Sequence, residues 1–156
     1  MNNNVYIMCG IPGIGKSTWI KNFKSNNKIV ISRDEIRFGL LSEEDDYFAR
    51  EEEVLIIFSS KIREAIIKNK NVDIFIDATH LNESSRRKTL NMIGLKLRSE
   101  NKIIAVTFPN DLEKAFEQNE LREGRSKVPK GVIRRMHSQF VPPALDEGFD
   151  EVMEVK

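Results

Sequence analysis

The sequence predicts an α/β fold in which helices cover both faces of a parallel β-sheet. Two observations support this prediction. Short apolar segments alternate with longer segments of helical periodicity along the chain, which is the order that right-handed β–α–β crossovers produce. The first apolar segment runs directly into a glycine-rich loop at residues 10–17, and such loops join a strand to a helix in phosphate-binding α/β domains.

Five apolar segments are predicted to form the strands. The first, Val5 through Cys9, has no charged residue, as expected for a strand covered on both faces of a parallel sheet. Because ligands of such sheets bind beyond the carboxyl ends of the strands, the residues after each strand are the first candidates for a site. The predicted strands span residues 5–9, 28–32, 72–77, 103–108 and 151–155.

Six segments are predicted to form helices. In the longest, Val54, Phe58 and Ile62 recur at helical spacing and are expected to face the core. Asn110 followed by Glu113 resembles the capping box that begins a helix, and the two prolines after residue 141 end the last one. The predicted helices span residues 16–25, 33–41, 45–69, 84–100, 111–121 and 129–140.

The composition is that of one globular domain. The chain has 156 residues, 40% of them hydrophobic, and a formal net charge of +1, so residues 1–156 are expected to form a single domain without a generally cationic surface. Cys9 is the sole cysteine, which excludes an intramolecular disulfide and favours a reduced, cytoplasmic setting. No apolar run is long enough to span a membrane, the first residues lack the layout of a signal peptide, and no feature indicates an oligomeric state.

The loop after the first strand matches the G-x-x-x-x-G-K-[ST] pattern without a mismatch, with Gly10, Gly15, Lys16 and Ser17 at its defined positions. The glycines allow backbone N–H groups to turn toward a polyphosphate, Lys16 adds a mobile positive charge, and Ser17 offers a hydroxyl to Mg²⁺. A simple glycine-rich turn is the alternative, but the strand before the loop and the helical spacing after it favour a triphosphate site. The residues expected to bind the ATP phosphates are Gly13, Ile14, Gly15, Lys16, Ser17 and Thr18.

An acidic residue and an arginine follow the second predicted strand. Asp34 is expected at the carboxyl edge of the sheet, where a carboxylate accepts a proton from a hydroxyl and orients it for in-line attack on phosphorus. Arg37 comes one helical turn later and is expected on the same side, where it would grip an anionic group of the acceptor. The alternative is an ordinary helix start, with Asp34 in the first turn and Arg37 in a solvated pair. Position alone favours neither interpretation.

The third predicted strand ends in Asp77, a candidate for the carboxylate on the magnesium side of the site. Capping of the following turn is the alternative role for Asp77. His80 is interpreted as a polar loop residue, because a lone histidine is weak evidence for a metal or a base. Asn82 is expected to cap the next helix, and Arg86 and Arg87 to lie on the solvated face of that helix.

A basic loop at residues 122–129 precedes the last predicted helix, and Arg122 and Arg125 flank a glycine in it. Such a segment can fold over a bound triphosphate and stabilise charge during transfer, so either arginine is a candidate catalytic residue of a short lid. The alternative is an ordinary exposed basic loop. A basic cluster also suits contact with a nucleic-acid backbone, and this function is compatible with the lid role.

Four segments together resemble the P-loop 5′-hydroxyl polynucleotide kinases. They read GIPGIGKSTW, SRDEIR, DATHLNESSRR and REGRSKVPKGVIRRM, and they extend over nearly the whole chain. The resemblance implies a three-layer P-loop kinase fold with a short arginine-containing lid, and it implies ATP and Mg²⁺ as cofactors. The chain departs from the family at His80, where asparagine is more common, and in the glycine spacing around Arg122 and Arg125, so neither arginine is preferred.

The same resemblance implies roles for individual residues. Lys16 would bind the ATP phosphates, and Asp34 would be the general base on the acceptor 5′-hydroxyl. Arg37 would hold the phosphate on the 3′ side of the terminal nucleotide. The metal is assigned to Ser17 and Asp77, and the remaining acceptor contacts to Asp77 and Thr79.

Three functions are consistent with these residues. The first is an ATP-dependent kinase that transfers the γ-phosphate to a 5′-hydroxyl end of RNA or DNA, which makes a nucleic-acid end the expected partner. The second is a small-molecule kinase of the same fold, acting on a sugar, nucleoside or antibiotic, with Asp34 in the same role. The third is an ATP-binding switch module. No Asn-Lys-x-Asp segment is present, which argues against a GTPase.

Overall fold

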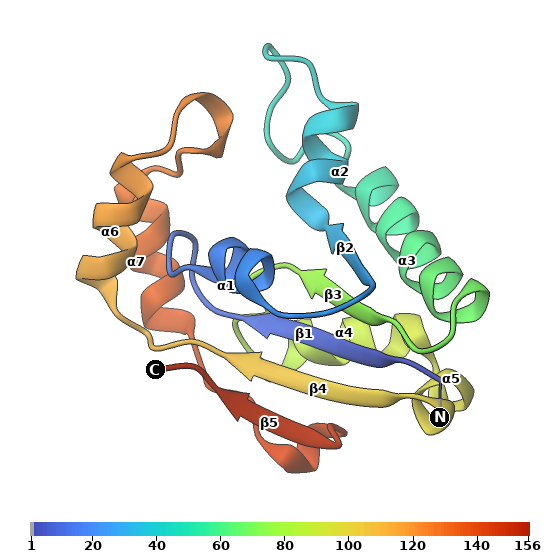
Figure 1. Ribbon diagram of the computed structural model, residues 1–156. Helices are drawn as coiled ribbons and strands as arrows, with labels where there is room; N and C mark the ends of the chain where they lie inside the picture. Colours follow the sequence, from blue (N-terminus) through green and yellow to red (C-terminus); the bar gives the residue numbers. More distant parts are fainter. Residues whose placement is uncertain (1) are drawn as a thin grey trace.

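A five-stranded parallel sheet with helices on both faces forms the centre of the computed structural model, which describes residues 2–156 (Figure 1). The spatial order of the strands is β2-β3-β1-β4-β5, and every adjacent pair is parallel. The predicted α/β fold is confirmed. In chain order the elements are β1 (Asn4–Cys9), α1 (Lys16–Asn22), β2 (Lys28–Ser32), α2 (Arg33–Leu40), α3 (Glu51–Lys68), β3 (Asp73–Asp77), α4 (Glu83–Ile93), α5 (Leu95–Glu100), β4 (Lys102–Thr107), α6 (Leu112–Glu120), η1 (Gly124–Ser126), α7 (Lys130–Gln139), η2 (Leu145–Glu147) and β5 (Glu151–Glu154).

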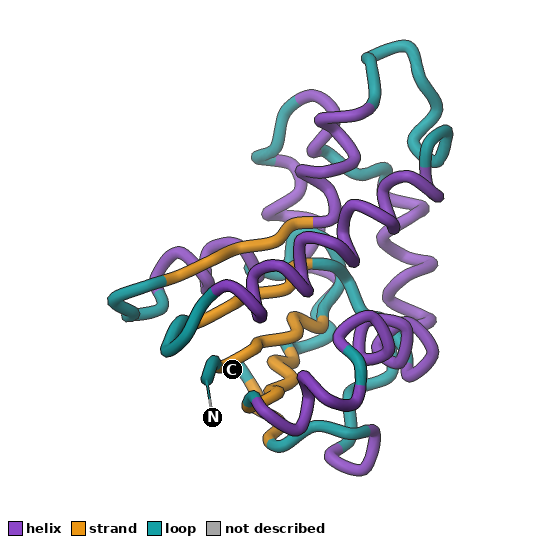
Figure 2. Tube along the Cα trace, turned by 90° about the vertical axis from the view of Figure 1, so that its right-hand side faces the viewer, coloured by secondary structure: helices purple, strands orange, loops and turns teal. Residues whose placement is uncertain are grey.

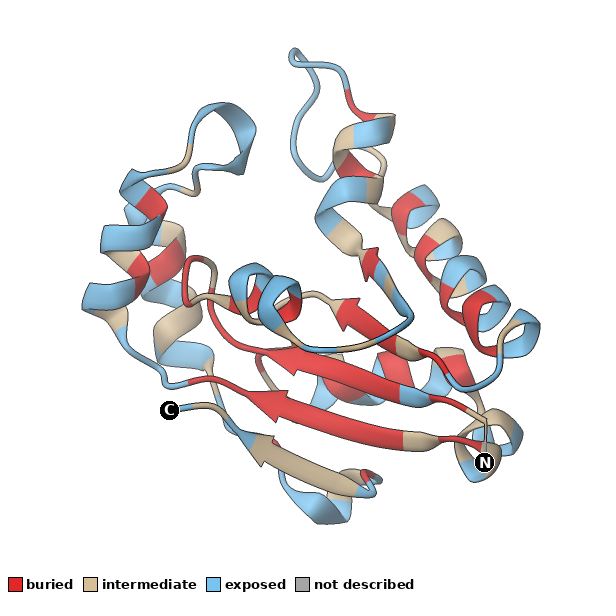
Figure 3. Cartoon of the chain, viewed as in Figure 1, coloured by how far each residue is buried: buried red, intermediate tan, exposed pale blue. Residues whose placement is uncertain are grey.

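Alternation along β1 divides the interior into two cores, one on each face of the sheet. Val5 and Ile7 pack with buried residues of α3 and α4, whereas Tyr6 and Met8 pack with residues of α1, α6 and α7. β1, β3 and β4 are buried along most of their length (Figure 3). Figure 2, turned by 90°, shows the strands in orange between the helices in purple. The three-layer arrangement follows from strands that are apolar on both faces.

The structure corrects three helix boundaries. The predicted helix over 84–100 is interrupted at Gly94, whose φ of +86° ends α4 and begins α5. The long helix begins at Glu51 rather than at residue 45, and its first three residues are glutamates, which favour a helix N-terminus. Asp111, not Asn110, caps α6, because its side chain accepts a hydrogen bond from the backbone N–H of Lys114.

Strand register brings the candidate residues to one edge of the sheet. Ser32, the last residue of β2, lies opposite Asp77, the last residue of β3. The N–H of Gly10 donates to the carbonyl oxygen of Thr79 over 2.9 Å. The phosphate-binding loop, the start of α2 and the end of β3 therefore adjoin one another, as the rule for parallel sheets predicts.

Cys9 lies in β1 and is fully buried. Burial raises the pKa of its thiol to about 12, so the thiolate that a nucleophile needs is not formed at neutral pH. Its role is packing in the core. Over residues 2–156, no helix combines the length and the apolar composition that a membrane crossing requires.

Candidate active site

The loop between β1 and α1 depends on two glycines with positive φ. Gly13 has a φ of +84° and Gly15 a φ of +109°, a region that residues with a side chain rarely adopt. A Cβ at Gly13 would also lie 2.5 Å from the carbonyl oxygen of Ala115 in α6. The loop is therefore held closely against α6, and Gly13 admits no side chain.

Lys16 lies inside this loop and is 9% exposed. Its Nζ donates to the carbonyl oxygen of Gly10 over 2.7 Å and to that of Ile11 over 3.1 Å. Burial lowers the pKa of Lys16 to about 8, and the Asp77 carboxylate partly opposes this shift. The ammonium group is thus held by the carbonyls of the loop rather than extended into solvent.

Charged side chains from separate segments act on Lys16 and Asp77 at the sheet edge. Beyond the effect of burial, Asp77 and Asp34 favour the charged form of Lys16, and Arg122 from the lid opposes it. Burial raises the pKa of Asp77, Lys16 and Arg122 lower it, and Asp34 raises it. The phosphate-binding loop, the start of α2 and the end of β3 adjoin at this edge, and the charge of Arg122 acts on both Lys16 and Asp77.

Arg37 is buried, which corrects the view of it as half of a solvated pair. It is 3% exposed. Its Nη2 donates to both carboxylate oxygens of Glu51 in α3, over 2.8 and 2.6 Å, and its Nη1 donates to Oδ1 of Asp34 over 2.6 Å and to the Tyr47 hydroxyl over 2.7 Å. The proximity of Asp34 and Arg37 was predictable from their spacing. Binding of an acceptor anion by Arg37 stays a prediction, and it requires the guanidinium to give up one of these partners.

Asp34 keeps most of its side chain in solvent, with 59% exposed. Its Oδ1 accepts a hydrogen bond from Arg37 and another, over 2.8 Å, from the Tyr47 hydroxyl. Burial and the nearby Asp34 charge raise the pKa of Tyr47 above its usual range, so this hydroxyl remains a donor. The carboxylate is therefore oriented from one side.

Glu51 and Tyr47 were missed by sequence reasoning. They come from α3 and from the connection that precedes it, 17 and 13 positions after Asp34. Spacing along a helix predicts neighbours three or four residues away and nothing at this separation. An acidic residue at the start of α3 was the one available signal, and it fitted a helix N-terminus equally well.

His80 lies in the loop after β3, as expected, but its ring is buried. Its Nδ1 donates to the carbonyl oxygen of Met8 over 2.7 Å, because a carbonyl can only accept, and its Nε2 then accepts from the Thr89 hydroxyl over 2.8 Å. Burial lowers the pKa of His80 to about 4. The neutral imidazole links β1 to α4 and has no nitrogen left for a metal or a substrate.

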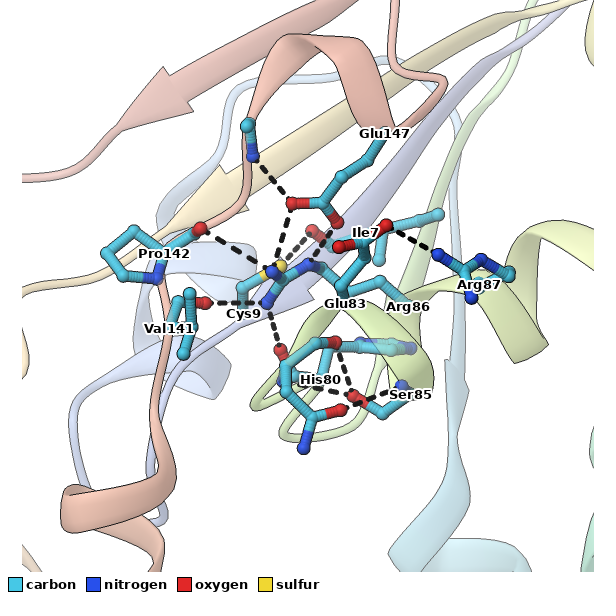
Figure 4. Close-up of polar contacts among 12 residues, drawn as sticks. Ile7, Cys9, His80, Glu83, Ser85, Arg86, Arg87, Val141, Pro142 and Glu147 are labelled. Carbon is cyan, nitrogen blue, oxygen red and sulfur yellow. Dashed lines mark hydrogen bonds and ion pairs between the residues drawn. The ribbon is translucent and has the colours of Figure 1, made fainter.

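Arg86 is fully buried, which corrects its placement on a solvated face; Figure 4 shows its polar contacts. Its Nε and Nη2 donate to the two carboxylate oxygens of Glu147 over 2.7 and 3.0 Å, and its Nη1 donates to the carbonyl oxygens of His80 and Val141 over 2.9 and 2.8 Å. The neighbouring Arg87 is exposed, as predicted. Arg86 shares the inward face of α4 with apolar residues, and two of its partners, Val141 and Glu147, are 55 and 61 residues away in the sequence.

The lid holds its two arginines in different directions. Nη1 of Arg125 donates to the carbonyl oxygen of Leu41 at the end of α2 over 3.1 Å, and the guanidinium carbon lies 5.0 Å from the centre of the Phe38 ring. Nη1 of Arg122 donates to the carbonyl oxygen of Ser126 within the lid over 3.2 Å. In Figure 1 the lid, in orange, and the α2–α3 connection, in cyan, extend to the same side of the sheet.

The sequence assigns the metal to Ser17 and Asp77, and this assignment stays a prediction. Ser17 is exposed in the first turn of α1, and Asp77 is partly buried at the end of β3. In the part of the chain that the structure describes, no group of three or more His, Cys, Asp or Glu side chains could hold a metal by itself. This donor set fits Mg²⁺, which proteins usually bind with one or two ligands together with substrate phosphates and water.

A family model described as an AAA domain matches residues 5–143. An L-seryl-tRNA(Sec) kinase of Methanococcus maripaludis is 26% identical over 152 residues, which cover 92% of this chain and 55% of that protein. The chain thus spans about half the length of this curated relative.

Solved structures share the fold. A chain in the structure of the Pnkp1/Rnl/Hen1 RNA repair complex matches with a TM-score of 0.66 and 21% identity, over 88% of this chain and 44% of that one. A tunicamycin resistance protein from Deinococcus radiodurans matches with a TM-score of 0.56 and 15% identity, over 97% of this chain and 86% of that one. At these identities the likeness establishes the fold, which is that of small P-loop kinases.

Proposed function

Because the chain belongs to the AAA-domain family that its residues 5–143 match, and has the fold of kinase-type P-loop phosphotransferases, we propose that it transfers the γ-phosphate of ATP to a 5′-hydroxyl end of RNA or DNA. The observation that carries the proposal is geometric: the loop that holds Lys16, the start of α2 with Asp34 and the end of β3 with Asp77 adjoin at one sheet edge. The charges of Asp34 and Arg122 act on both Lys16 and Asp77. A relative named for a tRNA-linked substrate and a fold neighbour from an RNA repair complex favour a nucleic-acid acceptor.

The proposed transfer is an in-line displacement at phosphorus. The acceptor hydroxyl oxygen forms a bond to the γ-phosphorus, its proton passes to Asp34, and the bond between the γ-phosphorus and the β–γ bridging oxygen breaks to release ADP. Lys16 neutralises charge on the outer phosphates. Mg²⁺, bound through Ser17 and Asp77, would neutralise further charge on them.

Arg122 is the stronger candidate for the lid arginine. Its charge acts on both Lys16 and Asp77, which favours a role on the donor side of the site. Arg125 is instead engaged at the end of α2. On this proposal Arg122 stabilises charge on the transferring phosphoryl group, and Arg125 fixes the lid against the acceptor side.

A small-molecule kinase is the second candidate. The tunicamycin resistance protein is matched over 86% of its length, against 44% for the chain of the RNA repair complex. Arg37 is already paired with Glu51, so an acceptor without a phosphate would leave the observed contacts intact.

Transfer from γ-labelled ATP separates the two candidates. With Mg²⁺ present, we expect label on 5′-hydroxyl RNA or DNA oligonucleotides, and none on the same oligonucleotides that already carry a 5′-phosphate. Salt should weaken acceptor binding, because oligonucleotide binding releases counterions. Label that appears only on nucleosides, sugars or antibiotics would establish the second candidate and exclude the first.

The lowered pKa of Lys16 predicts that ATP binding takes up a proton at alkaline pH. In the free protein Lys16 loses its proton near pH 8, whereas adjacent phosphates favour the ammonium form and raise that pKa. ATP affinity should therefore fall as the pH rises above about 8, by up to about tenfold per pH unit. Calorimetry in buffers of different ionisation enthalpy measures the proton uptake directly.

Lys16→Arg is the control for this linkage. A guanidinium stays charged throughout the range, so the binding that remains should show no proton uptake at pH 9. Equal uptake by Lys16→Arg and the unaltered protein would assign the proton to another group.

A further inference from the structure

Three aromatic side chains, Phe38, Tyr47 and Phe48, form a cluster beside the proposed general base. Phe38 comes from α2, and the other two from the α2–α3 connection. The Tyr47 ring lies 6.3 Å from Phe38 and 4.7 Å from Phe48, both in edge-to-face geometry. Phe48 is nevertheless 66% exposed, and Tyr47 44%. A large apolar ring kept in solvent at this place is a feature that the proposed chemistry does not use.

The cluster is held in place by the groups of the site itself. The guanidinium carbon of Arg37 lies 4.1 Å from the centre of the Tyr47 ring, and the Tyr47 hydroxyl donates to Asp34. Arg125 of the lid lies over Phe38. Phe48 therefore extends into solvent from this cluster, one side chain removed from Asp34, and its ring centre lies 5.8 Å from the guanidinium carbon of Arg37.

A nucleic-acid end carries an aromatic base one sugar away from its 5′-hydroxyl. The sugar with the 5′-hydroxyl also bears a base, so a hydroxyl held at Asp34 brings a flat aromatic ring to within one sugar of the cluster. Aromatic side chains bind bases by stacking without reading their sequence. Resting on the proposed function, we propose that Phe48 stacks on the base of the 5′-terminal nucleotide and thereby selects a nucleotide end as the acceptor.

The proposal is tested by removing, in turn, the base of the 5′-terminal nucleotide and the ring of Phe48. The acceptors are a 5′-hydroxyl oligonucleotide and the same oligonucleotide with an abasic 5′-terminal sugar. The unaltered protein should show an acceptor KM about tenfold higher for the abasic end. Phe48→Ala should raise the KM for the normal end by a similar factor and should no longer distinguish the two ends. The KM for ATP should not change.

Two further variants make the result specific to stacking. Phe48→Trp should retain discrimination between the ends. Ile67→Ala removes an equally exposed apolar side chain from the far end of α3 and should behave as the unaltered protein. Undiminished discrimination by Phe48→Ala overturns the stacking proposal and leaves the proposed function standing. If the unaltered protein phosphorylates neither oligonucleotide, both proposals are overturned.

Discussion

Asp34→Asn is expected to lower kcat for phosphoryl transfer to a 5′-hydroxyl oligonucleotide by about 100- to 10,000-fold. Asparagine has nearly the same shape and still accepts the hydrogen bond from Tyr47, but it cannot take the proton of the attacking hydroxyl. Because Arg37 keeps its bidentate pair with Glu51, the start of α2 should remain in place. ATP affinity, measured by calorimetry, should stay within about twofold of the unaltered value.

Glu35→Gln is the matched control. Glu35 is the next residue of the same helix turn, and its side chain is exposed, so removing its charge should leave both kcat and ATP affinity nearly unchanged. An equal loss of ATP binding and turnover in Asp34→Asn would indicate a disrupted site rather than a missing base. Turnover preserved in this variant would remove Asp34 from the mechanism.

The fold and the phosphate-binding loop were predictable because their signals are local. Five apolar segments, a complete loop pattern and the rule for strand ends identify the sheet and its active edge. The interruption of the helix at Gly94 was not predictable, because helical periodicity continues on both sides of this single glycine. Only the observed φ of Gly94 separates α4 from α5.

The surroundings of the site depend on long-range pairs that leave no local pattern. The contact between Asp34 and Arg37 follows from helix spacing, but the Arg37–Glu51 pair spans 14 residues and the Arg86–Glu147 pair spans 61. An arginine in a helix is usually exposed. It can be buried in the core only where a distant carboxylate and unpaired carbonyl oxygens accept its hydrogen bonds. The sequence pattern does not show which distant residues will do so.

Arg86→Ala is expected to destabilise the protein by about 3–5 kcal/mol, because it leaves the Glu147 carboxylate buried without a partner. The Glu147 side chain is 8% exposed, and the carbonyl oxygens of His80 and Val141 lose their donor as well. Since domains are commonly stable by only about 5–15 kcal/mol, this is a large share of the total. Urea unfolding, followed by circular dichroism, measures the change in free energy.

The adjacent Arg87→Ala separates burial from simple loss of charge. Arg87 is on the same helix, but its pair with Glu83 is exposed, so its removal should change the free energy of unfolding by less than about 1 kcal/mol. Replacing both members of the buried pair, in Arg86→Met with Glu147→Leu, removes the unpaired charge and should recover much of the lost stability. If Arg86→Ala lowers the free energy of unfolding no more than Arg87→Ala does, the buried pair contributes nothing to stability. Because Arg86 also holds the carbonyl of His80, three residues beyond Asp77, its loss should loosen the edge of the sheet that carries the site.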